Sequence, residues 1–317
     1  MRPMLSLIRR EFAAYFQSPI AYVVLGVFLL VTGHLFYLAT GQLTESGPRG
    51  TDNPMGVLLG DERFWLVFLF IPPLLTMRSF AEERSSGTLE MLMTAPIRDW
   101  QVVLGKFIAC LGFYLLMWLP TVLYLPVLLD FHTTWNLSAW SVFGVLLVLG
   151  VISVLISLLV CILGMRGWVC LLIFVLGAIF TTVGMWGHYS KDEHHLVDIA
   201  TGIDAWPVLT SYIGVILAGA MFLALGMFVS SLVKSQMVAA MIALILSLLF
   251  IVTGFWRPEL DTGGIVYRVL YFFSVPMHFR HDFTRGILDS RELLMYSTVA
   301  VFFLFITVRS LESRRWR

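Results

Sequence analysis

Long apolar stretches separated by short polar ones run through most of this chain. A helix needs about 20 predominantly apolar residues to cross a bilayer, and eight stretches reach or approach that length. Their centres contain no Asp, Glu, Lys or Arg, side chains that each cost about 2.5–3.5 kcal/mol at the middle of a bilayer. The predicted spans are residues 20–40, 63–78, 102–129, 138–164, 167–187, 207–233, 236–256 and 292–309.

The composition agrees with a membrane protein. Hydrophobic residues make up 59% of the 317 residues and charged residues 13%, about half the charged share of a typical soluble domain. We therefore predict an all-α, polytopic helical membrane protein. The first apolar run has full spanning length and no small-residue cleavage pattern follows it, so we expect an uncleaved span.

The distribution of charge predicts the orientation. Eight spans place both termini on one side of the membrane. If that side is the cytoplasm, the inner segments hold 13 of the 21 Lys and Arg residues but only 6 of the 20 Asp and Glu residues. Basic residues accumulate on the cytoplasmic side, so we expect a multi-pass protein of the cytoplasmic (inner) membrane with both termini in the cytoplasm.

Residues 1–19 have apolar positions at helical spacing, including Leu5, Ile8, Phe12 and Tyr15, with arginines elsewhere on the helical wheel. This pattern predicts a helix that lies in the inner membrane interface. An anchoring flank of the first span is the alternative, and the two interpretations are compatible.

A charged and polar interval, FAEERSSGTLEMLMTAPI at residues 80–97, separates the second and third spans on the predicted cytoplasmic side. Gly87 is suited to the N-cap of a short helix, Glu90 to the positive end of its dipole, and Pro96 to its end. Its apolar face consists of Leu89, Leu92 and Met93. Such a helix fits a groove on a cytoplasmic partner, but on physical grounds alone a helix resting on lipid is equally consistent with it.

The same interval, preceded by IPPLLTMRS and followed by VVLGK, resembles the cytoplasmic loop of ABC-2-type permeases. Within that family it is most similar to the branch of gliding-motility and nitrous-oxide-reductase-maturation permeases. RREFAAYFQSPIAYVV (9–24) resembles the family's elbow helix, LALGMFVSSLVKSQMVAA (223–240) a loop between later spans, and HFRHDFTRGILDSREL (278–293) with FLFITVRSLESRRWR (303–317) the C-terminal end. The resemblance covers most of the chain apart from residues 131–205.

The resemblance implies an ABC-2 (type V exporter-like) transmembrane domain whose helix around 88–95 is a coupling helix, seated in a separate ABC ATPase. The ATPase-coupling residues would then be Glu82, Glu83, Arg84, Gly87, Thr88, Leu89, Glu90, Leu92, Met93 and Pro96. The chain has no GxxxxGK[ST] motif, so we expect no enzyme activity and no cofactor in this chain, with ATP and Mg²⁺ bound by the partner. The implied assembly holds two ATPase subunits and two permeases, as a homodimer or heterodimer, in membrane lipid. Whether an accessory protein binds the outer face is left open, and no nucleic acid is expected.

The predicted organisation has six parts. These are an elbow helix (1–19), three spans with the coupling helix at 80–97 (20–130), an extra span pair with an outer loop (131–205), a span pair (206–256), outer interfacial or re-entrant helices (257–291), and a last span with a basic tail (292–317). The family usually has six spans, so the pair in 131–205 is an addition. TTVGMW (181–186) echoes IVTGFW (251–256), which hints at a partial duplication.

Several polar residues near the helix ends have simple structural explanations. Asp99 is suited to capping the helix that follows it, and Asp289 with Glu292 to starting the last span. The histidines of HYSKDEHH (188–195), and His278 and His281 beside Asp282, invite a metal-site hypothesis. A solvated acidic loop is the simpler explanation, because no helix-spaced ligand set occurs. Arg280, Arg285 and Arg291 could meet anionic headgroups or an anionic substrate, but we expect them to pair with Asp282, Asp289 and Glu292.

The leading functional hypothesis is the permease subunit of an ATP-driven ABC-2 exporter. The alternative is an ATPase-independent secondary transporter or channel, which would need ionisable residues inside its spans; His34 is the single candidate. An intramembrane enzyme is disfavoured, because the chain has no HExxH or GxSxG motif and no paired carboxylates within a span. The sequence leaves open the substrate and the choice between export and a mechanical role.

Overall fold

The computed structural model describes residues 2–17, 19–45, 54–88, 98–123, 205–255 and 265–315, and every regular element in these ranges is a helix. The chain divides into two compact units. The first comprises Met1–Val31, Met55–Leu115 and Trp206–Arg317, and the second comprises Thr32–Pro54 and Leu116–Ala205. Most of the second unit lies outside the described residues, as do the predicted spans at 138–164 and 167–187 and the loop 188–195. The contacts between helices described below lie within the first unit.

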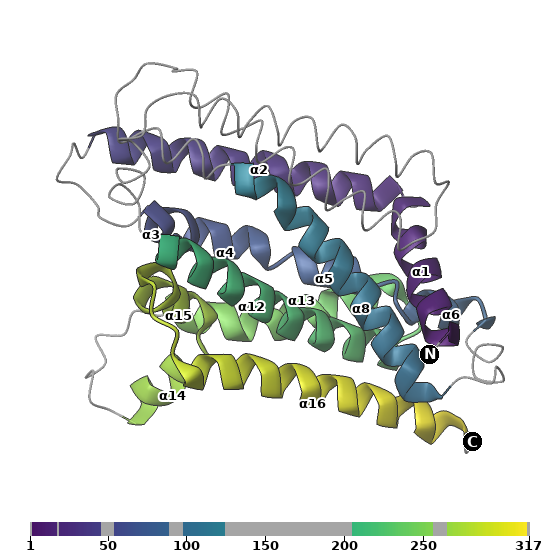
Figure 1. The fold of residues 1–317 in the computed structure, drawn as a ribbon. Coiled ribbons are helices and arrows are strands. Elements are labelled where there is room, and N and C mark those ends of the chain that lie inside the picture. Colours follow the sequence, from purple (N-terminus) through teal and green to yellow (C-terminus); the bar gives the residue numbers. More distant parts are fainter. Residues whose placement is uncertain are drawn as a thin grey trace. The chain divides into compact units, whose positions relative to one another are not determined.

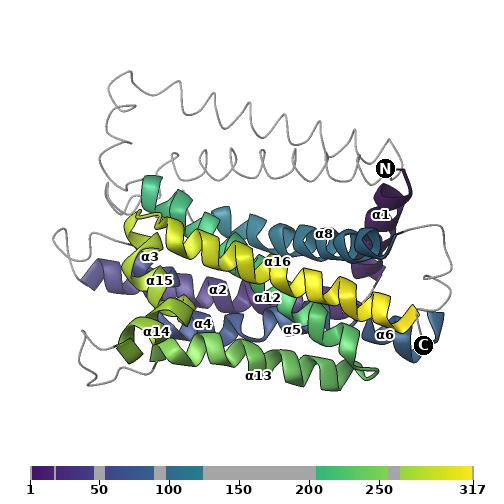
Figure 2. The same ribbon diagram turned by 90° about the horizontal axis from the view of Figure 1, so that it is seen from below.

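Five long helices lie at five of the predicted spans. They are α2 (Pro19–Glu45), α8 (Asp99–Trp118), α12 (Ala205–Leu232), α13 (Gln236–Phe255) and α16 (Ser290–Arg315). Each contains a stretch that is long and apolar enough to cross a membrane, and a 3-10 helix, η2 (Leu119–Leu123), extends α8. In Figures 1 and 2, α12, α13 and α16 run along one another.

One face of α13 is apolar and exposed. Met237, Met241, Ile245 and Leu249 follow one another at intervals of four residues, and each is exposed. Residues four apart share one side of a helix, so they form a continuous stripe. Soluble monomers rarely expose such a contiguous apolar surface, whereas lipid chains cover it in a bilayer.

The predicted span at 63–78 is built from short helices instead of one long one. The chain forms α3 (Pro54–Leu59), α4 (Glu62–Phe68), α5 (Ile71–Thr76) and α6 (Ala81–Ser85) in succession. Pro72 and Pro73 occupy the first turn of α5. Because proline has no N–H to donate to the preceding turn, it fits a helix start and breaks a helix interior.

This broken segment nevertheless runs along much of α12. At one end Trp65 lies against Phe279, with ring centroids 4.7 Å apart, and Phe279 packs on Gly214. At the other end the N–H of Phe80 donates to Ser230 Oγ. Gly214 and Ser230 are separated by about 24 Å along the helix axis at 1.5 Å per residue. The segment therefore runs alongside α12 over this distance, although each of its helices is too short to be recognised as a span.

The most enclosed helix, α12, accepts its neighbours at glycines. An added Cβ on Gly226 would lie 2.1 Å from Thr76 Oγ1 of α5, and one on Gly219 would lie 2.3 Å from the ring of Tyr114 of α8. The Tyr114 hydroxyl donates to the carbonyl of Val215 at 2.9 Å. These two positions require glycine because the neighbouring element comes too close for any side chain.

Residues 265–285 form two short helices and a 3-10 turn, α14 (Ile265–Phe273), α15 (Val275–His281) and η4 (Phe283–Arg285). Thr210 Oγ1 donates to the carbonyl of Phe283 at 2.6 Å, which fixes η4 to the start of α12. This part of the chain and α6, near Ser230, thus lie about 30 Å apart along α12, close to the thickness of a hydrocarbon core.

Two predictions about polar residues need correction. Arg280 Nη1 lies 4.0 Å from Glu62 Oε1 of α4, so its partner belongs to a segment far away in the sequence. At the start of α8, Gln101 Oε1 accepts a hydrogen bond from the N–H of Arg98 at 3.2 Å, so the side chain that reaches back is Gln101 and not Asp99. The predicted cap of α16 is confirmed for Asp289, whose Oδ1 accepts from the N–H of Arg291 at 2.9 Å.

Candidate functional site

The base of the predicted coupling segment is α6, and its first turn is buried. Phe80 and Ala81 are fully buried, and their N–H groups both donate to Ser230 Oγ of α12 at 3.1 Å. The first N–H groups of a helix have no partner within it. Ser230 therefore caps α6 from another helix, and its hydroxyl also donates to the carbonyl of Met77 at 3.2 Å.

The end of α12 is capped in return by α6. Arg84 Nη1 donates to the carbonyls of Ser231, at 3.4 Å, and Leu232. The last carbonyls of a helix lack intrahelical donors, and a cation is favourable at that end of the helix dipole. Each helix thus satisfies backbone groups that the other leaves open, which ties α6 firmly to α12.

A network of four charged residues joins α6 to α1 (Arg2–Gln17) and α8. Lys106 of α8 is only 3% exposed, and its Nζ lies 3.0 Å from Glu11 Oε2 and 2.8 Å from Glu83 Oε1. Arg10 Nη2 lies 2.8 Å from Glu11 Oε1 and 3.8 Å from Glu83 Oε1. A buried ammonium group is tolerated only when it is paired, and the two carboxylates supply its partners.

The titration of the network follows from its geometry. Burial by itself raises the pKa of Glu11, but the charges of Lys106 and Arg10 and their hydrogen bonds outweigh burial, so the pKa is lowered. The hydrogen bond to Glu11 raises the pKa of Arg10. Both shifts favour the charged forms of Glu11 and Arg10.

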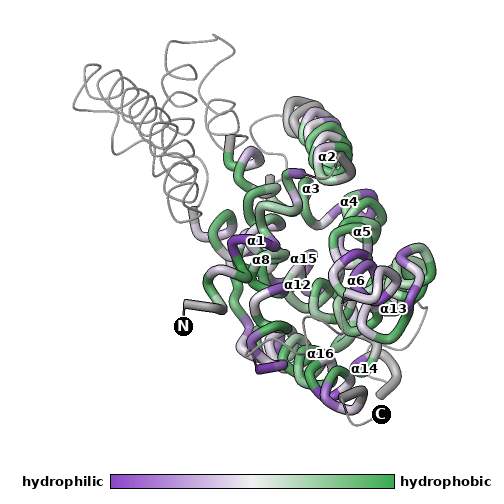
Figure 3. The backbone as a smooth tube through the Cα atoms, turned by 90° about the vertical axis from the view of Figure 1, so that its right-hand side faces the viewer, coloured by the Kyte–Doolittle hydropathy of each residue, from purple (hydrophilic) through white to green (hydrophobic). Residues whose placement is uncertain are grey.

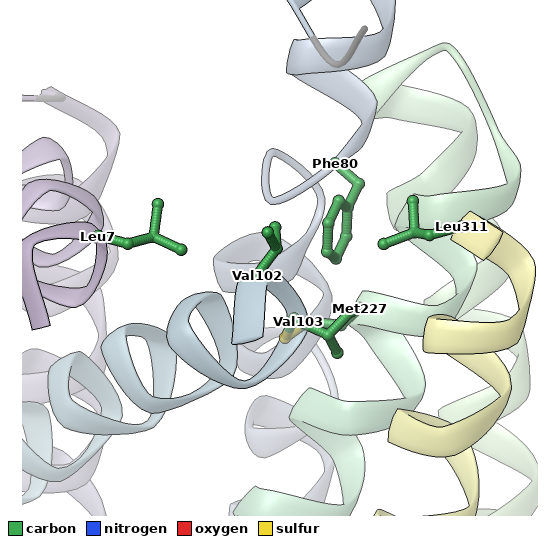
Figure 4. Packing of buried hydrophobic residues seen from close by; sticks show 6 residues of the cluster. All are labelled: Leu7, Phe80, Val102, Val103, Met227 and Leu311. Atoms are coloured by element: carbon green, nitrogen blue, oxygen red, sulfur yellow. The ribbon is translucent and has the colours of Figure 1, made fainter. Parts of the chain in front are cut away.

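Apolar packing surrounds the same point. Phe80 lies between residues of α8 and α16, and the Nζ of Lys106 lies 5.5 Å from the centroid of its ring, a cation–π geometry. The cluster in Figure 4 consists of Leu7, Phe80, Val102, Val103, Met227 and Leu311. These residues come from α1, the start of α6, α8, α12 and α16. The helix near the N-terminus and the end of α16 consequently lie at the same end of the unit.

A cavity of about 550 Å³ adjoins the network. Its polar lining includes Glu11, Glu82, Glu83 and Lys106, and it extends to Thr88, the last described residue before the predicted coupling helix. Figure 3 shows the hydrophilic colour concentrated on α1 and α6 in this region. The site is therefore a polar pocket beside a rigid junction.

The structure places part of the predicted coupling residues. Glu82 is exposed, Glu83 and Arg84 make the contacts above, and the Thr88 and Ser86 hydroxyls lie 2.9 Å apart. Gly87 follows the C-cap residue Ser86 and has a φ of 74°. That conformation is typical of a glycine just past a helix end. The next residue, Thr88, is helical, so Gly87 as the N-cap of the following helix stays a prediction. The predicted residues outside the described ranges are Leu89, Glu90, Leu92, Met93 and Pro96.

The groups that hold α6 were not predictable from the sequence. Ser230 and Glu11 gave no signal, because a serine in an apolar helix and a single acid near a span are both ordinary. Lys106 was a weak signal as a charge near the end of a predicted span, since such residues are paired or functional.

Comparison with known proteins identifies a family model for part of the chain. Residues 55–165, about a third of the chain, match the family model described as ABC-2 family transporter protein. No curated protein matches the chain. The matched segment includes α6, Glu83 and Lys106. Together with the long apolar helices, this similarity to ABC-2 transporters over part of the chain supports a multi-pass membrane protein.

Proposed function

We propose that this chain is the permease subunit of an ATP-driven ABC-2 exporter, and that a separate ATPase subunit docks on residues 80–97. In this proposal two permeases and two ATPases form the working complex in the cytoplasmic membrane, with both termini in the cytoplasm. Within the family, we propose that the chain is related to the branch that includes gliding-motility and nitrous-oxide-reductase-maturation permeases.

The observation that carries the proposal is the rigid attachment of α6. A docked helix transmits force only if its base moves together with the spans. Ser230 and Arg84 fix α6 to α12, and Lys106 fixes it to α8 and α1. Because packed interfaces shift between discrete arrangements and do not deform continuously, movement of α6 would reorient these helices as a body.

The charge distribution favours this proposal over a secondary transporter. Within the five described spans, Lys106 and Glu292 are the buried charged residues. Lys106 lies in the second turn of α8 and Glu292 in the first turn of α16, so both are near span ends. Ion or proton coupling would instead need such groups near the middle of the membrane.

Affinity purification of the full chain from native membranes tests the proposal. We expect a polypeptide with a P-loop ATPase motif to co-purify in equal amount, and Leu92→Asp to remove it, because a charge on the apolar face prevents its burial in a groove. Ile287→Asp is the matched control, since Ile287 is an exposed apolar residue outside this segment. An active wild-type complex without any ATPase, or full ATPase recovery with Leu92→Asp, would overturn the proposal.

A further inference from the structure

A second cavity, of about 340 Å³, lies among α14, α15 and the start of α16. Glu292, Asp289, Arg268 and Arg291 line it, together with the aromatic rings of Tyr271 and Phe272. Its volume is near the lower end of small-ligand pockets, so it fits a headgroup and not a whole lipid.

Glu292 is buried in this cavity without a full set of partners. Glu292 is only 5% exposed, and its Oε2 has no hydrogen-bond partner within the described part of the chain. Polar groups around it are satisfied: Asp282 Oδ2 accepts from the Tyr271 hydroxyl at 2.7 Å, and His278 Nδ1 lies 2.9 Å from the Tyr296 hydroxyl. The carboxyl groups of Asp282 and Asp289 add negative charge beside that of Glu292. A buried carboxyl oxygen without a donor is costly, so a ligand that donates hydrogen bonds and carries positive charge would satisfy Oε2 and offset the clustered acids.

The acidic residues of the cavity are more buried than its arginines. Glu292 is buried and Asp289 partly buried, whereas the side chains of Arg268 and Arg291 are exposed. A ligand that fits this arrangement carries its cation inward and its anion outward. Tyr271 and Phe272 add ring faces that favour an ammonium group, and guanidinium groups at the rim suit a phosphate.

The surroundings indicate a lipid as the source of this ligand. Glu292 is the third residue of α16, a helix long and apolar enough to cross a membrane, so the cavity lies at the level where headgroups are found. Exposed apolar side chains continue from it, namely Val269, Phe273 and Leu294. They offer a path for acyl chains outside the cavity.

From this geometry we infer that the cavity binds the zwitterionic headgroup of a phosphatidylethanolamine-type lipid, with its ammonium on Glu292 and its phosphate between Arg268 and Arg291. The inference is independent of the proposed ATPase coupling, because it concerns ligand binding at the other end of the helices. It assigns to residues 265–292 a recognition role beyond that of a short interfacial helix pair.

Binding of short-chain lipids to the purified full chain in detergent, measured by native mass spectrometry and by thermophoresis, tests the inference. We expect dihexanoyl phosphatidylethanolamine to bind at least about tenfold more tightly than dihexanoyl phosphatidylglycerol, which has the phosphate but no ammonium. Equal affinity for the two lipids would overturn the inference. Free phosphoethanolamine bound as tightly as the lipid would overturn the lipid source.

Variants separate the two halves of the site. Glu292→Gln should weaken phosphatidylethanolamine binding about tenfold and leave phosphatidylglycerol binding unchanged, whereas Arg291→Gln should weaken both. Arg280→Gln is the control, because Arg280 is an exposed arginine on α15 that faces Glu62. Phosphatidylethanolamine affinity within about twofold of wild type in Glu292→Gln would contradict the assignment. The comparison of lipids on the wild-type chain decides the question even if that variant does not fold.

Discussion

Lys106 Nζ lies 2.8 Å from Glu83 Oε1, and this contact joins a buried lysine in the second turn of α8 to α6, the helix that precedes the predicted coupling helix. The two residues are 23 positions apart, and the partner on the other side, Glu11, is 95 positions from Lys106. One ammonium group thus connects three helices. Its energetic weight should exceed that of a surface ion pair, because its burial removes the alternative of hydration.

Lys106→Met should therefore destabilise the protein. The change leaves the carboxylates of Glu11 and Glu83 without their buried partner, and we expect the free energy of unfolding to fall by about 3 kcal/mol. Thermal unfolding in detergent measures the effect as a lower Tm. Arg309→Met is the control: Arg309 forms an exposed pair with Glu312 at 2.8 Å, and such pairs contribute about 0–1 kcal/mol. Equal Tm values for the two variants would show that the network is not a stabilising element.

Ser230→Ala should loosen the start of α6. The substitution removes the acceptor for two buried N–H groups, at a cost of about 1–2 kcal/mol. Hydrogen exchange followed by mass spectrometry should show faster exchange at Phe80 and Ala81, whose N–H groups lose their partner. Ser297→Ala is the matched control, because the exposed Ser297 hydroxyl only donates to the carbonyl of Leu293 in its own helix. Unchanged exchange at Phe80 and Ala81 would contradict the capping role of Ser230.

The long helices were predictable because their signal is local. An uninterrupted apolar run of about 20 residues has few stable alternatives to a spanning helix, and α2, α8, α12, α13 and α16 all follow this rule. The position of the segment 63–78 was predicted, but its division into short helices was not. Pro72 and Pro73 are compatible with either a kinked span or a new helix start, and only the packing against α12 decides between them.

The site was predictable only in part, because its contacts are non-local. The sequence indicates that residues 80–97 are unusual, but not that Ser230 and Glu11 hold their base, since neither residue type carries information about a partner so far away. Gly87 illustrates a similar limit. A glycine between two helical stretches can end the first or cap the second, and the five-residue helix α6 is too short to be recognised by periodicity.

Gly226→Ala should disrupt the contact between α12 and α5. The added Cβ would lie 2.1 Å from Thr76 Oγ1 and 3.0 Å from Thr76 Cβ, so α5 or its neighbours must shift, at a cost of about 1–3 kcal/mol. The expected result is a lower Tm, and Thr76→Ala in the same chain should recover part of it by removing the nearest atom. Gly26→Ala is the control, because nothing lies within 4 Å of the added Cβ in α2. It should be neutral or stabilising, since alanine favours the helix.

His278 should make stability depend on pH between about 4 and 6.5. Burial lowers its pKa from 6.5 to about 4, against the smaller opposing effect of Asp282 and a backbone hydrogen bond to Tyr271. Between these two pKa values the unfolded chain binds a proton that the folded chain does not. Stability therefore rises with pH across this window and falls as the pH drops below about 6.5. A difference of this size corresponds to about 3 kcal/mol.

Unfolding midpoints measured from pH 4 to pH 7.5 check this dependence, and His278→Gln separates it from other titrations. Glutamine can still hydrogen-bond to the Tyr296 hydroxyl but does not titrate, so the slope between pH 4 and 6.5 should become shallower while the midpoint at pH 7.5 changes little. His34→Gln is the control, since His34 is exposed on α2 and its removal should leave the slope intact. An unchanged slope in His278→Gln would show that His278 is not the titrating group in this window. Glu11 contributes at lower pH: its lowered pKa means that its stabilising effect is lost only as the pH falls below its ordinary value of 4.5.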